Sequence, residues 1–197
     1  MAKEKKSSPV LSRRFFLQQT TRILAGMTVA SMPVISSAAS VPVLRSTRSM
    51  GKRSLSFYHI HTQQSLDVTY AWGTAYNAAA LEKINQYLRD FRTGEVYPID
   101  PKLLDILWKI QEDMGRKGVY EVISAFRSPA TNGQLRQNGS GVADRSLHLQ
   151  GKAIDVRFTG ARTNQIQQRA INLQQGGVGY YAKSDFVHLD TGRYRVW

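Results

Sequence analysis

Residues 148–158 read HLQGKAIDVRF, a turn around a glycine followed by a run in which apolar side chains alternate with others. Successive side chains of a β-strand point to opposite faces, so Ile154 and Val156 share one face while Asp155 and Arg157 share the other. The stretch therefore predicts a strand in the interior of a sheet, with its apolar face in the core and a carboxylate on its second face.

A carboxylate in the interior of a sheet is costly unless a cation accompanies it. Arg157 lies on the same face as Asp155 and is one candidate partner. The other candidate is a metal ion, because Gly151 lets the preceding backbone turn and His148 can then swing over the same face. Taken alone, the stretch leaves both interpretations open.

The stretch FVHLD near the C-terminus supplies a second imidazole, His188, together with a further acid, Asp190, on the same face of a strand. Hairpin-like pairing could bring this strand beside that of Asp155, and His188 would then join His148 and the carboxylate. Two imidazoles and one carboxylate, with a fourth position open to water, are typical of a catalytic zinc site. The spacing indicates such a site, while an ion pair between Asp155 and Arg157 stays the alternative.

The composition excludes several other kinds of chemistry. A chain of 197 residues with 42% hydrophobic and 10% aromatic content suits one globular domain with a leader segment. The absence of cysteine excludes disulfides, thiolate nucleophiles and Cys-ligated metals, so any metal must be held by His, Asp and Glu. No segment reaches the roughly 18 uninterrupted apolar residues of a membrane span.

The formal net charge is +13, and residues 1–39 contribute +5 of it through six Lys and Arg against one acidic residue. A basic surface can attract nucleic acid, an anionic membrane or an anionic wall polymer. After residue 39 the sequence has no Lys/Arg-rich run and no recognition-helix or RNP-like pattern, so nucleic acid is not expected as a partner.

Residues 1–39 have the organisation of an export signal: a basic start, an apolar stretch, and small residues that suit cleavage before Ser40. Residues 12–18, SRRFFLQ, resemble the twin-arginine export signal S-R-R-x-F-L-K at all but the last position. We therefore expect the twin-arginine export machinery as a partner, a periplasmic location, and no stable membrane span after processing. Residues 40–53 are predicted to be a linker, which leaves 54–197 as the folded domain.

Helices and short strands are expected to follow one another without regular βαβ alternation. Asp100 and Ser128 each precede a proline and so predict two helix starts. We expect helices at 77–94, from Asp100 to about Gly115, from Ser128, and at 163–175, and strands at 54–60, 65–72, 119–126, 152–158, 176–181 and 186–192. The predicted fold class is α+β, with a small antiparallel sheet flanked by helices.

Three motifs carry a resemblance to a known family. Residues 146–155 match the pattern S-x-H-x-x-G-x-A-x-D, which is the signature of the zinc D-Ala-D-Ala peptidases, a group that includes lysostaphin-like endopeptidases and the hedgehog fold. Residues 124–128, SAFRS, resemble the S-G-Y-R-S of this group, and residues 185–188 resemble its E/D-x-x-H. Similar stretches recur in order over nearly the whole chain, so the resemblance implies a hedgehog/D-Ala-D-Ala-peptidase-like fold.

The resemblance also implies a role for each matching residue. His148, Asp155 and His188 would hold one Zn²⁺ per chain. Asp185 would be the general base, and Arg127 would contact the substrate or the developing oxyanion.

Some positions depart from the family pattern. Ala125 and Phe126 stand where the family has Gly and Tyr, so a tyrosine hydroxyl is absent. Asp185 stands three residues before His188, a spacing that faces away in a regular strand, so it must lie in a turn to reach the site. Asp190 competes with it, either as the base or as a group that orients an imidazole.

The function implied is that of a zinc-dependent murein endopeptidase, which hydrolyses cross-links between peptidoglycan stem peptides, including links between two diaminopimelate residues. The alternatives are a D-Ala-D-Ala-type carboxypeptidase and a non-catalytic peptidoglycan-binding module. The two remaining histidines, His59 and His61, lie on one face of an early strand and are predicted to have a packing role.

Overall fold

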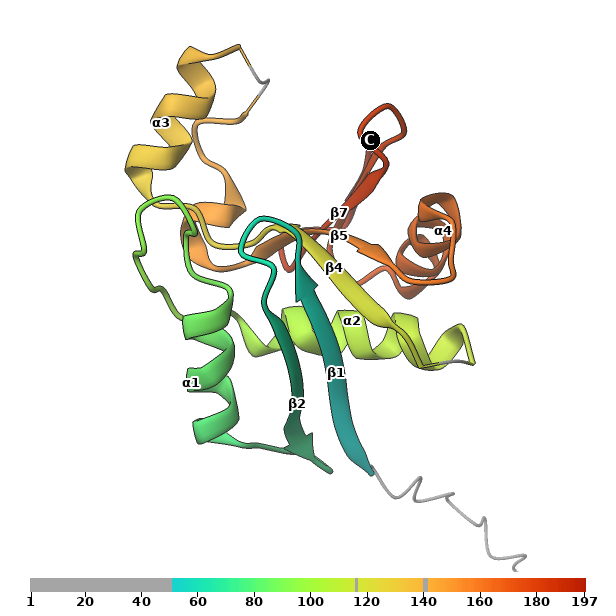
Figure 1. Ribbon diagram of the computed structural model, residues 1–197. Helices are drawn as coiled ribbons and strands as arrows, with labels where there is room; N and C mark the ends of the chain where they lie inside the picture. Colours follow the sequence, from blue (N-terminus) through green and yellow to red (C-terminus); the bar gives the residue numbers. More distant parts are fainter. Residues whose placement is uncertain (1–50, 116, 140–141) are drawn as a thin grey trace, which may run out of the picture. The chain divides into compact units, whose positions relative to one another are not determined.

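The computed structural model describes residues 51–115, 117–139 and 142–197 (Figure 1). The predicted export signal at 1–39 lies outside these residues, as does the predicted linker at 40–53 up to residue 50. Lys52 and Arg53 already belong to the first strand, so the folded part begins two residues earlier than predicted. In the part of the chain that is described, no helix is both long and apolar enough to cross a membrane.

A single mixed sheet of eight strands forms the centre of the described domain, in the order β3-β2-β1-β4-β5-β7-β6-β8. Its strands are β1 (Lys52–His59), β2 (Ser65–Trp72), β3 (Ala75–Tyr76), β4 (Val119–Ser124), β5 (Ala153–Phe158), β6 (Gly177–Tyr181), β7 (Phe186–Asp190) and β8 (Arg195–Val196). The pairs β1–β4 and β6–β8 are parallel, and the others are antiparallel.

The prediction of a small antiparallel sheet is therefore wrong in size and in two of its pairings, whereas the mixture of helices and strands is confirmed. Two helices, α1 (Ala78–Tyr87) and α2 (Pro101–Asp113), lie between the first hairpin and β4. A connection of this length lets β4 enter beside β1 in the parallel direction, which a tight turn cannot do.

The helix starts follow the capping residues. Asp100 accepts a hydrogen bond from the Lys102 N–H at the start of α2, and Ser128 caps α3 (Pro129–Gln137), so both predicted starts are confirmed. Helix α1 ends at Tyr87 rather than near Gly94. The Asp90 carboxylate accepts the N–H groups of Arg92 and Ser128, and such side-chain bonds to the backbone compete with helix continuation.

One face of the sheet forms the core. Its side chains are apolar at every second position, for example Leu55 and Phe57 in β1 and Ile154 and Val156 in β5, and all are nearly inaccessible to solvent. Helix α2 and helix α4 (Thr163–Leu173) contact this sheet and each other, and Figure 1 shows α2 crossing behind β1 and β4. The opposite face of β5 and β7 carries polar side chains, among them Asp155 and His188.

Candidate metal centre

Strand register brings the predicted strand pair together. Strand β5 lies between β4 and β7, and Asp155 is directly opposite His188 of β7 and Ser124 of β4. Alternation places Asp155 and His188 on the face that the core does not use. The predicted neighbourhood of these two strands is thus confirmed.

The turn before β5 carries His148 over this face. A single 3₁₀ turn, η1 (Leu147–Gln150), begins at Ser146, whose hydroxyl accepts the His148 N–H. It ends at Gly151, which has a φ of 62°. A Cβ at Gly151 would lie 2.1 Å from the Pro98 carbonyl oxygen, so the turn requires glycine on both conformational and steric grounds.

Three ligand-type atoms converge above β5. His188 Nδ1 lies 2.8 Å from Asp155 Oδ1, and His148 Nε2 lies 3.3 Å from the same oxygen. The two imidazole nitrogens are 3.2 Å apart. Within the described residues, this is the one group of three or more His, Asp or Glu side chains whose ligand atoms could share a metal ion.

Each imidazole is oriented by a bond on its other nitrogen. His148 Nδ1 donates to the Ala125 carbonyl oxygen at 2.5 Å, which leaves Nε2 to face Asp155. His188 Nε2 lies 3.1 Å from Asp190 Oδ2, which leaves Nδ1 to face the same point. Carbonyl and carboxylate partners of this kind fix the ring orientation of metal-binding histidines. The donor set therefore fits a small, borderline-soft cation such as zinc.

The carboxylate of Asp190 is occupied by hydrogen-bond donors and is not free to accept a proton from a water molecule. Its Oδ1 accepts the N–H groups of Gly177 and Gly192 at 3.0 and 2.8 Å, and its Oδ2 accepts Arg195 Nη2 at 2.7 Å besides His188. Burial would raise the pKa of Asp190, but these hydrogen bonds outweigh burial and hold the pKa well below its usual range. The carboxylate stays ionised and fully engaged, as the predicted orienting role requires.

The cation beside Asp155 is Arg127, not Arg157. Arg127 Nη2 donates to Asp155 Oδ2 at 2.7 Å, and Nε donates to the Ser124 hydroxyl at 2.8 Å. Arg157 instead donates to the backbone carbonyl oxygens of Ser184 and Asp185. The predicted alternative, an ion pair between Asp155 and Arg157, is therefore wrong: Asp155 presents one oxygen to Arg127 and the other to the two histidines.

The pKa values of the two histidines are shifted in opposite directions. Burial lowers the pKa of His148, which stays neutral. Burial also disfavours charge on His188, but its hydrogen bonds to Asp155 and Asp190 outweigh burial and raise its pKa. A metal bound at this point would displace a proton from the Nδ1 of His188.

Asp185, the predicted general base, lies elsewhere. It occupies the β6–β7 turn with a φ of 50°, and its Oδ1 accepts the Thr163 hydroxyl at 2.8 Å. Its Oδ2 is 3.6 Å from Arg157 Nε, and its side chain lines a second cavity together with Glu121. The structure does not bring Asp185 to the histidines, because the turn directs its side chain toward the start of α4.

The cluster lies at a cavity of about 390 Å³. Three arginines line it, Arg127, Arg145 and Arg195, and so do three aromatic residues, Tyr181, Phe186 and Trp197. Reasoning from the sequence assigned no role to Arg145, Arg195 or Trp197. A signal for Arg195 was hard to find, because it reaches Asp190 only when the C-terminal residues pair as β8 beside β6.

The other two histidines pack among aromatic rings, which confirms the packing role predicted for them. His59 is 1% exposed and contacts the rings of Tyr87 and Phe91 edge-on. Burial lowers its pKa to about 4. His61 is exposed and stacks on Phe91 with ring centroids 4.3 Å apart.

Comparison with known proteins gives concordant similarities. The family model described as peptidoglycan L,D-endopeptidase MepK matches residues 47–197. The peptidoglycan L,D-endopeptidase MepK of Escherichia coli (strain K12) is 38% identical over 145 residues, which are 74% of this chain and 80% of that protein. The probable peptidoglycan L,D-endopeptidase MepK of Haemophilus influenzae is 39% identical over 146 residues, 74% of this chain and 78% of that protein.

Among solved structures, the Serratia marcescens L-Ala D-Glu endopeptidase ChiX aligns with 57% of this chain and 86% of its own length. The sequence identity is 18% and the TM-score is 0.38, so this likeness is too distant to support a conclusion on fold or function.

Proposed function

This chain belongs to the peptidoglycan L,D-endopeptidase MepK family, and from that premise we propose that it cleaves peptidoglycan peptides at a zinc ion held by His148, Asp155 and His188. Membership confirms the zinc D-Ala-D-Ala peptidase group that the motifs predicted. The observation that carries the proposal is the convergence of two oriented imidazole nitrogens on one oxygen of Asp155. A zinc ion, when bound, supplies Lewis-acid chemistry that activates water and polarises a carbonyl group.

The proposed substrates are the cross-linked stem peptides of peptidoglycan, including those joined through two diaminopimelate residues. The relatives are named endopeptidases, which supports internal cleavage over the removal of a terminal D-Ala. The intact ligand set supports an enzyme over a binding module that has lost its chemistry.

Arg127 is assigned two tasks. Its Nη2 and Nε hold Asp155 and Ser124, which keeps the carboxylate turned so that its other oxygen faces the histidines. Its Nη1 makes no hydrogen bond to any described residue, and the side chain lines the same cavity as the cluster. A fixed cationic donor in this place would stabilise negative charge that develops on a scissile carbonyl oxygen.

Proton transfer by Asp185 stays a prediction. The bonds of Asp185 to Thr163 and Arg157 argue against it, because they hold the carboxylate at the second cavity. Asp190 is also unsuited, since both of its oxygens are saturated by donors. Among the described residues, Asp155 is the one acid that lines the cavity of the cluster.

The same proposal includes the compartment. The SRRFFLQ motif at residues 12–18 supports export by the twin-arginine machinery to the periplasm, where the substrate lies. Replacing both arginines of the motif by lysine should leave the precursor in the cytoplasm, which cell fractionation followed by immunoblotting would detect.

The decisive experiment is cleavage of purified cross-linked muropeptides by the protein, followed by mass spectrometry of the products. We expect cleavage that a chelator abolishes and added zinc restores, and no cleavage by Asp155→Ala or Asp155→Asn. Asp67→Ala is the matched control, because Asp67 is an exposed acid on β2 that does not line the cavity.

Circular dichroism of each variant separates loss of folding from loss of chemistry. Cleavage that survives the chelator would refute the role of the metal. Absence of cleavage under every metal condition would refute the enzymatic function.

A further inference from the structure

Of the three arginines that line the cavity, one has no carboxylate partner among the described residues. Arg127 is paired with Asp155, and Arg195 is paired with Asp190. Arg145 is exposed and makes no ion pair or hydrogen bond with any of the described residues. Its charge is therefore the uncompensated one at the rim of the cavity.

The segment that carries Arg145 is held on both sides of it. The Asn132 side chain donates to the Ala143 carbonyl oxygen at 3.3 Å, and Arg136 of α3 binds the Asp144 carboxylate at 2.5 Å. On the other side, Ser146 caps the turn that carries His148. Asp144, the acid next to Arg145 in the sequence, is thus directed to α3 and does not neutralise it.

The cavity also has an aromatic side. Tyr181 stacks on Phe186 with ring centroids 4.5 Å apart, and Trp197 Nε1 donates to the Tyr181 hydroxyl at 3.1 Å. Phe186 and Tyr181 are paired neighbours in β7 and β6, so the three rings lie together on one side of the cavity. Such rings accept aliphatic parts of a ligand and offer no full charge to an anion. A ligand carboxylate in this cavity is therefore directed to the arginines.

We propose that Arg145 binds a free carboxylate of the substrate next to the scissile bond and makes the enzyme select substrates in which this carboxylate is not amidated. This inference rests on the proposed function. A diaminopimelate that supplies the nitrogen of a cross-link keeps a carboxylate on the carbon that bears this nitrogen, so the carboxylate carbon is two bonds from the nitrogen of the amide to be cut. Arginine recognises a carboxylate through two parallel hydrogen bonds, which a neutral carboxamide cannot reproduce.

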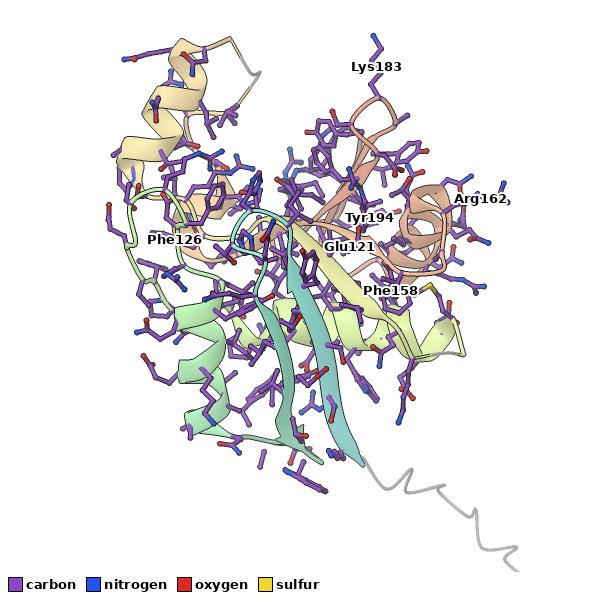
Figure 2. The ribbon with its side chains drawn as sticks, in the orientation of Figure 1. Glu121, Phe126, Phe158, Arg162, Lys183 and Tyr194 are labelled. Carbon is purple, nitrogen blue, oxygen red and sulfur yellow. The ribbon has the colours of Figure 1, made fainter. Side chains whose placement is uncertain are left out.

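The test uses two cross-linked muropeptides that differ only in whether that carboxylate is free or amidated. The full chain and its Arg145→Ala and Arg145→Lys variants are compared by kcat and KM. Lys183→Ala is the matched control for removal of a positive charge, since Figure 2 shows Lys183 pointing away from the sheet at the tip of the β6–β7 turn.

The unaltered enzyme should prefer the free acid by about tenfold or more, as expected for loss of a charge-assisted pair. Arg145→Ala should lose this preference by raising KM for the free acid, with the amidated substrate unaffected. Arg145→Lys should restore part of it, and Lys183→Ala should change neither substrate.

Equal cleavage of both substrates by the unaltered enzyme would overturn the carboxylate site while leaving the endopeptidase intact. A preference that persists in Arg145→Ala would overturn it as well. Failure to cleave either substrate would overturn the proposed function and the inference together.

Discussion

Two pairs of histidines in this molecule are almost equally close, yet only one of them has the surroundings of a metal site. The ring centroids of His148 and His188 are 5.0 Å apart, and those of His59 and His61 are 5.9 Å apart. His59 ends β1 on the core face, whereas His188 lies in β7 on the opposite face. Proximity of two imidazoles therefore does not distinguish the pairs.

The surroundings of the two histidine pairs distinguish them. The His59–His61 pair is surrounded by aromatic rings, and nearby Arg89 and Arg92 add to burial in lowering the histidine pKa values. The His148–His188 pair shares Asp155, and His188 has Asp190 on its far nitrogen. Carboxylates give the second pair the donor set of a cation site, whereas the first pair packs on aromatic rings, with His59 buried and His61 exposed.

The largest expected effect comes from removing one histidine of each pair. His188→Ala should lower kcat/KM by at least about a thousandfold, because a ligand to the metal contributes several kcal/mol to the transition state. His61→Ala should leave activity unchanged, since His61 is exposed, its ring contacts Phe91 and His59, and it does not line the cavity of the cluster. Zinc content after dialysis, measured by mass spectrometry, should fall in the first variant alone. Equal zinc loss in both would contradict the distinction between the pairs.

The arginines near the two pairs provide the next test. Arg127→Ala should reduce kcat by about a hundredfold or more, as for loss of a donor to a developing oxyanion. Arg92→Ala should have no such effect, because the Arg92 guanidinium lies over the Phe91 ring, 4.2 Å from its centroid, beside the His59–His61 pair. Steady-state kinetics on one muropeptide decides between them. An unchanged kcat in Arg127→Ala would show that this arginine does not stabilise the developing oxyanion.

Substitutions of the two candidate acids, Asp190 and Asp185, should differ by a smaller factor in their effect on zinc affinity. Asp190→Asn should weaken zinc affinity by about 10- to 100-fold, since outer partners of metal-binding histidines have effects of this size. Asp185→Asn should keep both zinc and activity, because its carboxylate bonds to Thr163. Competition with a chromogenic chelator gives the affinity. An Asp185→Asn variant that binds zinc normally but is inactive would restore the base role that the sequence predicted.

The faces of Asp155 and His188 and the approach of His148 were predictable because they depend on local rules. Strand alternation fixes the face of Asp155 and of His188, and the glycine turn fixes the approach of His148. The partner of Asp155 was not predictable in this way. Arg157 shares its face but lies about 6.6 Å further along the strand, and a bulge in β4 between Val122 and Ser124 accompanies the approach of Arg127 from the next loop.

The errors in the fold came from long-range pairing. The parallel contact of β1 with β4 depends on how two helices return the chain to the sheet, and the C-terminal β8 pairs beside β6 through only two residues. Neither leaves a periodic signal in the sequence. The position of the Asp185 side chain depends on the left-handed backbone conformation of Asp185 itself. An aspartate can adopt this conformation, so no glycine marks the turn in the sequence.

The smallest expected effect is a pH dependence of stability that belongs to the aromatic pair. The pKa of His59 is about 4 in the folded protein, below its ordinary value of 6.5, so the unfolded chain binds the proton more tightly. The stabilisation is complete above pH 6.5 and is lost as pH falls toward 4. We expect the protein to lose about 1 to 2 kcal/mol more between pH 7 and 4.5 than a His59→Gln variant does. Urea unfolding at the two pH values measures this difference, and the buried His148 contributes equally to both proteins. If both lose the same stability, His59 is not held neutral by its aromatic surroundings, and the contrast between the two histidine pairs would have to rest on the carboxylates alone.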